Sequence, residues 1–252
     1  MTETHTGRTG GTGEHRLDID LTAVEPLAPV AFQAEATVQD VNRQAVAGRA
    51  ALVVHPAARY VGLRPESGFA RAGRDFRLDA IVVDLDGAPA VGTAIALAVE
   101  RVGWETVGGQ VVEKLEPVAG GDLVSTAEPV AWRVRLERGG QYRVSADIVD
   151  DEGRPNRTTI TLYAAGAEAA PDRSLPSEAL QLVPDQTEYA PGETARILVV
   201  APFAPAEGWL WVSRPGVVRS ERFRMEEAST TLEVPIEESW LPNVVLQASV
   251  VG

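Results

Sequence analysis

Carboxylates are the residues of this sequence best suited to chemistry, and Asp84 and Asp86 stand two apart in the segment DLDG. Two carboxylates so placed can share one calcium ion, because hard cations prefer oxygen ligands. A full calcium loop also needs a bidentate Glu further on, and Ala88-Pro89 follows instead. A hairpin turn is therefore the favoured interpretation, with a calcium site as the alternative.

A second group of acidic residues could join that site from the end of a neighbouring strand. Its members are Asp147, Asp150, Asp151 and Glu152. A solvated turn is the favoured interpretation of this group too. We expect no metal ligand and no cofactor-binding residue, and the question of calcium at Asp84 and Asp86 stays open.

The three histidines lack the surroundings that nucleophilic catalysis needs. His5, His15 and His55 are far apart in sequence, and only His55 lies inside a predicted element, at a domain edge. No G-x-S-x-G or comparable nucleophile motif is present. Acidic residues are so frequent that pairs of them, as used in glycoside hydrolysis, are expected by chance. The sequence predicts no catalytic residue and no enzyme activity.

Tryptophans are the other side chains that could form a binding site. Trp209 and Trp211 point the same way on one strand and could make a sugar-stacking platform if that face were open. Core positions are favoured for both, as for Trp104 and Trp132, because β-sandwiches fill their interior with large aromatics. Trp240 lies beside a turn and is expected at a domain contact.

The composition excludes several classes of protein. The chain has 252 residues, 44% of them hydrophobic, and can bury a core. A net charge of −13 argues against a nucleic-acid partner. The lack of cysteine excludes disulfides and thiolate chemistry. We also expect no signal peptide and no membrane span in this chain, because no apolar run approaches the required length.

Two internal repeats indicate an array of similar units. LRPESGFARAGRDFRL (63–78) returns in altered form as VPDQTEYAPGETARILV (183–199), and both predict a strand that ends at a proline, a polar loop, an aromatic and a glycine turn. Residues 31–55 align without a gap on residues 75–99, which places Asp40 on Asp84. Repetition on this scale favours tandem domains.

The hydrophobic pattern predicts an all-β chain. Apolar residues alternate with polar ones in several short segments, including 17–21, 76–82 and 142–148, whereas no segment holds the helical period. Short strands separated by turns favour tandem antiparallel β-sandwiches of the immunoglobulin or fibronectin-III kind. In the central sandwich the alternation predicts the inward-facing residues Phe76, Val82, Trp132, Val134, Tyr142 and Val144.

Prolines and lapses in alternation divide the chain. The predicted pieces are a flexible arm (1–15), a partial domain (16–56), a complete sandwich (57–165), a linker (166–172) and a sandwich that is complete or cut short (173–252). The partial domain offers about three strands, too few to close a sandwich. We expect it to leave Phe32, Ala34 and Val38 uncovered, to be less protected than the central domain, and to promote self-association.

Several segments, in order, resemble the macroglobulin-like (MG) domains of the bacterial alpha-2-macroglobulin family. They are LVVHPAARYVGLRPE (52–66), IVVDLDGAPAVG (81–92), YRVSADIVDDEGRPN (142–156), LVPDQTEYAPGETARILVVAPF (182–203) and VPIEESWLPNV (234–244). The resemblance implies tandem seven-stranded sandwiches in a large periplasmic or secreted protein that traps proteases. In that family a bait segment is cleaved and a thioester of a C-x-E-Q motif then captures the protease.

The chain departs from the family at the thioester, because it has no cysteine. Nothing in it resembles the bait segment or the thioester domain, so no functional residue is carried over. The resemblance implies a non-catalytic structural segment of an endopeptidase inhibitor, with other MG domains as partners and proteases as targets of the complete protein. The alternatives are a free-standing adhesive or surface-display array, and a carbohydrate-binding part of a secreted enzyme.

Overall fold

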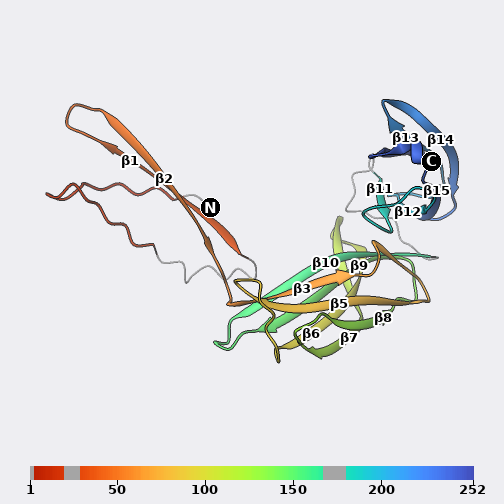
Figure 1. The fold of residues 1–252 in the computed structure, drawn as a ribbon, viewed down its shortest axis with the longest axis horizontal. Helices are drawn as coiled ribbons and strands as arrows, with labels where there is room; N and C mark the ends of the chain where they lie inside the picture. Colours follow the sequence, from red (N-terminus) through yellow and green to blue (C-terminus); the bar gives the residue numbers. More distant parts are fainter. Residues whose placement is uncertain (1–2, 20–28, 167–179) are drawn as a thin grey trace. The chain divides into compact units, whose positions relative to one another are not determined.

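The computed structural model describes residues 3–19, 29–166 and 180–252. The chain forms two compact units, Met1–Pro56 and Ala57–Gly252 (Figure 1). The regular elements of the described residues are sixteen β-strands and one short 3-10 helix. The predicted all-β fold is therefore confirmed. No helix among these residues is both long and apolar enough to cross a membrane.

Among its described residues, 3–19 and 29–56, the first unit contains one antiparallel hairpin. Strand β1 (Val30–Gln39) pairs with β2 (Ala45–Val54) along its whole length. Of the three or so strands expected between residues 16 and 56, the described residues contain two, and residues 20–28 lie outside the described part. In the predicted strand at 17–21, residues 17–19 are not in a strand, and residues 20 and 21 lie outside the described part. Residues 17–19 alternate in polarity, but an isolated segment of this kind needs a neighbouring strand to pair with. Among the described residues of this unit, β1 and β2 pair with each other.

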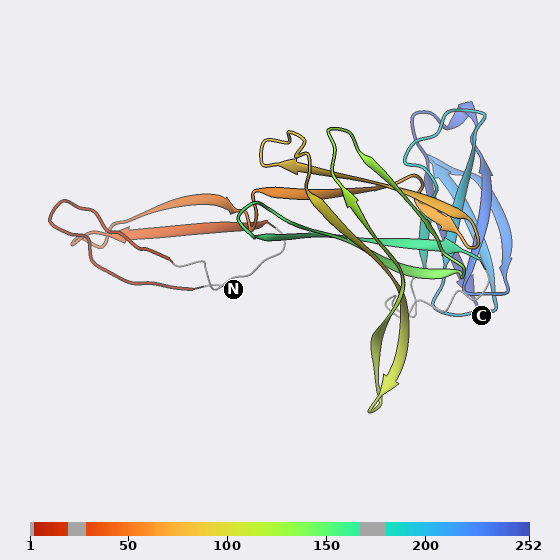
Figure 2. The ribbon, with the colours of Figure 1, turned by 90° about the horizontal axis from the view of Figure 1, so that it is seen from below.

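The second unit begins with a sandwich of two sheets (Figure 2). One sheet has the order β3-β5-β8, built from β3 (Arg59–Pro65), β5 (Asp75–Asp84) and β8 (Val130–Arg135). The facing sheet has the order β4-β10-β9-β6-β7, built from β4 (Phe69–Arg71), β10 (Pro155–Ala165), β9 (Gly140–Val149), β6 (Ala94–Val107) and β7 (Gln110–Val124). All these pairs are antiparallel except β4 with β10.

The core of this sandwich lies between the two sheets. Side chains from β5 and β8 pack there against side chains from β6, β9 and β10. Five of the six residues predicted to face inward are buried: Phe76, Val82, Val134, Tyr142 and Val144. Trp132 is half-buried and packs against both halves of the core. The period-two prediction is thus confirmed for the five buried residues.

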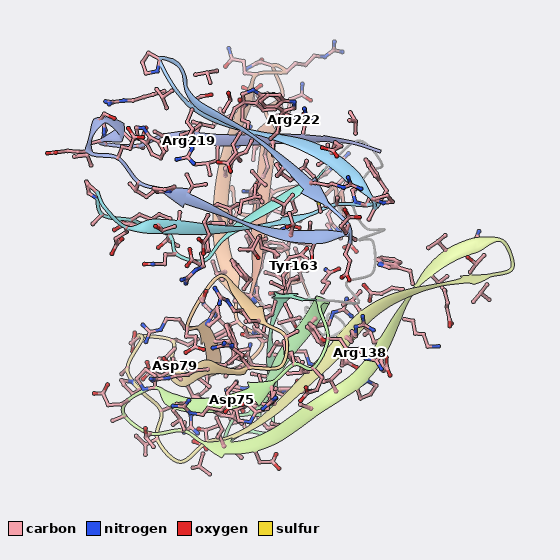
Figure 3. The ribbon with its side chains drawn as sticks, turned by 90° about the vertical axis from the view of Figure 1, so that its right-hand side faces the viewer. Asp75, Asp79, Arg138, Tyr163, Arg219 and Arg222 are labelled. Carbon is pink, nitrogen blue, oxygen red and sulfur yellow. The ribbon has the colours of Figure 1, made fainter. Side chains whose placement is uncertain are left out.

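Strands β6 and β7 are longer than the sandwich that they belong to. Strand β9 accompanies β6 only as far as Arg101, whereas β6 and β7 stay paired to Val107 and Gln110. The extra length projects from the sandwich as a two-stranded arm (Figures 2 and 3). Trp104 lies on this arm and is half-buried, so its predicted place in the core is wrong.

The rest of the second unit is built from two three-stranded sheets around a separate core. One has the order β11-β12-β15, from β11 (Gln181–Pro184), β12 (Thr194–Val200) and β15 (Ser229–Pro235). The other has the order β14-β13-β16, from β14 (Gly216–Met225), β13 (Ala206–Arg214) and β16 (Val245–Val251). The 3-10 helix η1 (Glu238–Trp240) places Trp240 in the core of this second sandwich.

Candidate interaction sites

The aspartates first considered as calcium ligands form tight turns. Asp84 Oδ1 accepts hydrogen bonds from the N–H groups of Asp86 (3.0 Å) and Ala88 (2.9 Å). Gly87, at φ 83°, donates to the Asp84 carbonyl. These bonds confirm the hairpin turn, since Asp and Gly supply the geometry that such turns require.

Two other aspartates head turns of the same construction. Asp40 Oδ1 accepts from the second and fourth following N–H groups at 2.8 Å each. Asp150 Oδ1 accepts from the corresponding pair at 3.0 Å each. The match between Asp40 and Asp84 agrees with the repeat that places 31–55 on 75–99. Asp150 heads a third turn of this kind; the turn predicted for this acidic group is confirmed, but the prediction that it is solvated is wrong for Asp150, which is buried.

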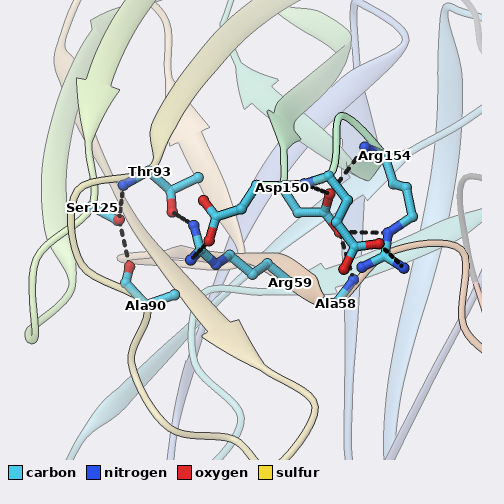
Figure 4. A network of polar contacts seen from close by, with 9 residues as sticks. Ala58, Arg59, Ala90, Thr93, Ser125, Asp150 and Arg154 are labelled. Carbon is cyan, nitrogen blue, oxygen red and sulfur yellow. Dashed lines mark hydrogen bonds and ion pairs between the residues drawn. The ribbon is translucent and has the colours of Figure 1, made fainter.

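Asp150 differs from the other two because it is buried and its second oxygen is also occupied (Figure 4). Oδ2 accepts from the Ala58 N–H at 2.9 Å and from Arg154 Nε at 2.8 Å, and 2% of the side chain is exposed. Burial alone would raise the pKa of Asp150. The hydrogen bonds from Ala58, Arg154 and Glu152 outweigh burial and hold the pKa well below its usual range.

Arg59 adds a second positive charge, beside that of Arg154, at this end of the sandwich (Figure 4). It stands opposite Asp84 in the β3–β5 ladder, pairs with Asp151, and donates to Thr93 Oγ1 at 3.1 Å. The Thr93 N–H in turn donates to Ser125 Oγ. The Arg59 guanidinium thus balances negative charge at this end of the sandwich. Its bonds connect the start of β3 to the loop that contains Asp151 and to the loop that contains Thr93.

The remaining acidic members of that group, Asp147 and Glu152, are paired as well. Glu152 Oε2 lies 3.1 Å from Arg154 Nη1. Asp147 accepts from Arg157 Nε at 2.6 Å. Across residues 3–19, 29–166 and 180–252, no group of three or more His, Asp or Glu side chains is placed to hold a metal ion. The geometry of these carboxylates is that of turns and ion pairs.

The histidines lie in the first unit and take separate local roles. His5 pairs with Glu3 at 3.5 Å, and His15 packs against Gly7. His55 lies between β2 and β3 and is exposed.

The tryptophan predictions for the second sandwich are wrong. Trp209 and Trp211 were expected in the core and lie outside it, whereas Trp240 was expected at the surface and is buried. Trp209 is 42% exposed and Trp211 half-buried on the outer face of β13, where the Arg222 guanidinium lies 5.9 Å from the Trp209 ring centroid. Figure 3 labels Arg222 on this sheet. The inner face of β13 is filled instead by Leu210 and Val212. Trp240, expected at a domain contact, is buried in the core.

The two sandwiches of the second unit meet at a junction that the sequence did not predict. The Gly68 N–H donates to the Asp185 carbonyl oxygen at 2.9 Å, and Ser67 Oγ donates to the same oxygen at 3.1 Å. The Tyr163 hydroxyl donates to Gln181 Oε1 at 2.6 Å. We use the name junction cluster for the buried apolar residues at this place, which are Phe69, Tyr163, Leu198 and Val200.

The junction is formed by the two copies of the first repeated motif. In one copy Glu66 Oε1 accepts from the Arg77 N–H, and in the other Asp185 Oδ1 accepts from the Arg196 N–H, each at 2.9 Å. Asp185 also accepts from the Tyr189 hydroxyl at 2.7 Å. Burial and this hydrogen bond raise the pKa of Tyr189 to about 12.

Comparison with known proteins adds family information. The family model described as the alpha-2-macroglobulin bait region domain matches residues 180–252. An alpha-2-macroglobulin homolog of Nostoc sp. is 23% identical over 232 residues, which are 88% of this chain and 12% of that protein. This chain therefore spans about an eighth of the length of that relative.

Solved structures of bacterial proteins are also similar. The native conformation of Escherichia coli alpha-2-macroglobulin matches with TM-score 0.41 and 18% identity, over 90% of this chain and 16% of that one. A Salmonella alpha-2-macroglobulin mutant matches with TM-score 0.39 and 18% identity, over 88% and 15%. The family-model match corrects one expectation, because residues 180–252 do resemble a bait region domain.

Proposed function

Because this chain belongs to the alpha-2-macroglobulin family, we propose that it is a non-catalytic structural segment of a protease-trapping protein. Its sandwiches, at 57–165 and 181–252, are MG domains that act as a rigid spacer and as contact surfaces. Its partners are further MG domains of the complete protein, which takes proteases as targets outside the cytoplasm.

The junction between the two sandwiches is the observation that carries this proposal. A flexible string of domains would need only a linker, whereas here four apolar side chains are buried between the two cores. The Asp185 carbonyl accepts from both Ser67 and Gly68. Burial of apolar area holds the two sandwiches together. The hydrogen bonds fix their orientation, because they form only at a narrow range of angles. A junction of this kind suits a rigid spacer that holds neighbouring domains at a fixed distance.

The bait region match places a limit on this proposal. Residues 180–252 form part of the domain type that carries the cleaved segment in the family, and most of that stretch is strand. Backbone held in a β-ladder is a poor protease substrate, because cleavage requires local opening. We propose that these residues are the framework of a bait region domain and not the cleaved segment.

Limited proteolysis of the whole chain tests both statements. We expect proteases of different specificity to leave 57–165 and 181–252 intact, and the same proteases to cut both regions once urea unfolds the chain. The urea digest is the control for the presence of cleavable bonds. If proteases of unrelated specificity all cut one stretch inside 181–252 in the native chain, that stretch is a bait and the framework proposal fails.

The exposure of Trp209 favours a second function for the outer face of β13, namely carbohydrate binding. Arg222 and Ser249 flank Trp209 in register, and such groups can hydrogen-bond the hydroxyls of a sugar stacked on the ring. Titration with soluble oligosaccharides, followed by tryptophan fluorescence, tests this function. A response that Trp209→Ala removes and Trp104→Ala retains would support it, and no response would exclude it for the sugars used.

A further inference from the structure

The two sandwiches of the second unit repeat the same order of strands. In the central sandwich β9 lies beside β6, and β6 lies beside β7; in the second sandwich β16 lies beside β13, and β13 lies beside β14. The facing sheets match as well, since β3-β5-β8 corresponds to β11-β12-β15. The repeated motif supports this match, because Pro65 at the end of β3 aligns with Pro184 at the end of β11. Strand β16 is therefore the counterpart of β9.

The match between the two sandwiches ends beyond this strand. In the central sandwich β10 pairs with β9 along most of its length, and β4 pairs with the other side of β10. The counterpart of β4 is not a strand: with Phe69 placed on Tyr189, Ala70 of β4 aligns with Ala190, which lies in the loop between β11 and β12. Among the described strands, none takes beside β16 the place that β10 takes beside β9. We use the name open edge for the side of β16 that faces away from β13.

Burial differs between β9 and β16 as this difference in neighbours predicts. The residues of β9 that face the core are at most 2% exposed, namely Tyr142, Val144, Ala146 and Ile148. The corresponding row of β16 packs against its core but is only half-buried, and it consists of Leu246, Ala248 and Val250. Likewise Ala70 is 1% exposed, whereas Ala190 is exposed. The core of the second sandwich is therefore incompletely covered at the open edge.

The open edge also lacks the residues that prevent strand addition. Charged side chains and prolines on an edge strand keep other chains from pairing with it. Every other edge strand of the described sheets contains at least one such residue, including Arg59 on β3 and Pro235 on β15. Strand β16, with the sequence VLQASVV, contains none. Alternate residues of β16 direct their N–H and C=O groups away from β13, and no backbone hydrogen bond joins these groups to another described residue.

We propose that the open edge binds an extended polypeptide segment from outside this chain, which adds to β16 as an antiparallel strand. An extended backbone is the partner that matches a row of N–H and C=O groups at a strand edge. Strand β10 shows which side chains the segment needs, since it runs antiparallel to β9 and places Ile160 and Leu162 against the core. The segment is therefore apolar at alternate positions, on the side that covers Leu246 and Val250.

The occupant is a single strand and not a second copy of this chain. In the central sandwich β4 follows β10 directly, so that one strand fits at this place. A second copy would bring β13 and the rest of its sandwich together with its own β16. The net charge of −13 on each copy also opposes the approach of two copies. A short apolar segment brings neither the bulk nor the charge.

A terminally blocked peptide with the sequence of β10, PNRTTITLYAA (155–165), is the probe, because this strand fills the corresponding place in the central sandwich. Fluorescence anisotropy of the labelled peptide, titrated with the whole chain into the high micromolar range, measures binding. We expect saturable binding. Ile160→Lys and Leu162→Lys together in the peptide should weaken it at least about tenfold, because they place charges against the core.

A pair of chain variants tests the same contact from the other side. Ala248→Asp places a charge on the core side of β16 and should weaken binding at least about tenfold. Ser249→Asp is the matched control, because Ser249 is the next residue on β16 and is exposed on the outer face. Its effect on binding should be less than about twofold. Urea denaturation verifies that both variants fold, and the peptide substitutions decide the question if Ala248→Asp does not.

Hydrogen exchange locates the bound peptide. Protection should rise at alternate amides of residues 245–251, whereas residues 140–149 should stay unchanged, because β10 already covers β9. Two further peptides carry N-methyl groups at alternate residues, so that each lacks the N–H donors of one edge. Strand addition requires that one of them binds much more weakly than the other.

Several results would overturn the proposal. They are the absence of saturable binding, equal binding of the two methylated peptides, and equal binding by folded Ala248→Asp and Ser249→Asp chains. Full protection of 245–251 before peptide is added would show that the chain covers its own edge. A dimer that sedimentation velocity detects, that Ala248→Asp abolishes and that the peptide does not dissociate would identify a second copy as the occupant instead.

Discussion

The backbone N–H of Gly68 donates to the carbonyl oxygen of Asp185 over 2.9 Å, and this bond joins the opening loops of the two copies of the repeated motif. A Cβ at position 68 would overlap the Pro184 carbonyl oxygen, so only glycine allows the approach. The repeat thus has a structural consequence beyond the reuse of a strand-turn-strand unit, because each copy presents its loop to the other.

Gly68→Ala should weaken the junction. The added methyl group meets backbone, which cannot rotate away, and overpacking of this kind costs about 1 to 3 kcal/mol of the free energy of unfolding. Urea denaturation measures the loss, and faster hydrogen exchange at Phe69 and Leu198 should accompany it. Gly103→Ala is the control, since a Cβ at 103 would make only an ordinary contact of 3.7 Å with the Lys114 carbonyl. Equal stability of the two variants would contradict the role assigned to Gly68.

Trp132→Ala and Trp209→Ala should differ in stability. Trp132 packs against both halves of the central core, so its truncation should cost about 3 kcal/mol or more. Trp209 lies on an open face beside Arg222, and loss of that cation-π contact should cost about 0.5 to 1 kcal/mol. Thermal and urea unfolding of both variants provide the comparison. A larger loss for Trp209→Ala would show that the assignment of inner and outer faces is wrong.

The sequence predicted the inward-facing residues well in strands of alternating polarity and poorly in strands with two apolar rows. Period two correctly placed Phe76, Tyr142 and Val144 inside, because polar residues flank each of them on its own strand. In β13 both rows are apolar, Trp209 with Trp211 on one side and Leu210 with Val212 on the other. Periodicity cannot decide which row is the core in such a strand, and volume alone favoured the wrong one. Phe223 packs over Gly208, which lies in the same inward row as Leu210 and Val212.

Contacts between distant parts of the chain were outside the reach of local patterns. The turn residues Asp84 and Gly87 were predicted from their identity, since turn geometry is a local property. The packing of whole sheets determines the long-range hydrogen bonds. Two examples are the bond between Asp150 and Ala58 and the bond between Gly68 and Asp185. The one available signal for the junction was the repeated motif itself. Its loops are similar in both copies, but similarity does not say that the two loops touch.

The isolated chain should show no thioester chemistry. A thioester requires a cysteine, and this sequence has none. We expect no incorporation of labelled methylamine, no hydrolysis of peptide substrates, and no protease conjugate that survives a denaturing gel. A homologous protein with an intact C-x-E-Q motif is the positive control. Covalent attachment of methylamine to this chain would contradict the non-catalytic assignment.

Asp150→Asn should make stability less dependent on acid. The pKa of Asp150 is lowered in the folded chain, so its stabilising effect is complete above the unfolded value of about 3.9 and is lost as the pH falls from there toward the folded value. At neutral pH we expect the variant to lose on the order of 2 kcal/mol, because charged hydrogen bonds to Ala58 and Arg154 become neutral. Below about pH 4 the two proteins should converge. Asp86→Asn is the matched control, since Asp86 is exposed in a turn of the same construction and its substitution should change stability by less than about 0.5 kcal/mol at any pH. Urea denaturation from neutral pH down to the acid range measures both, and a difference between wild type and Asp150→Asn that does not shrink with acid would rule out the ionised, hydrogen-bonded carboxylate as its cause.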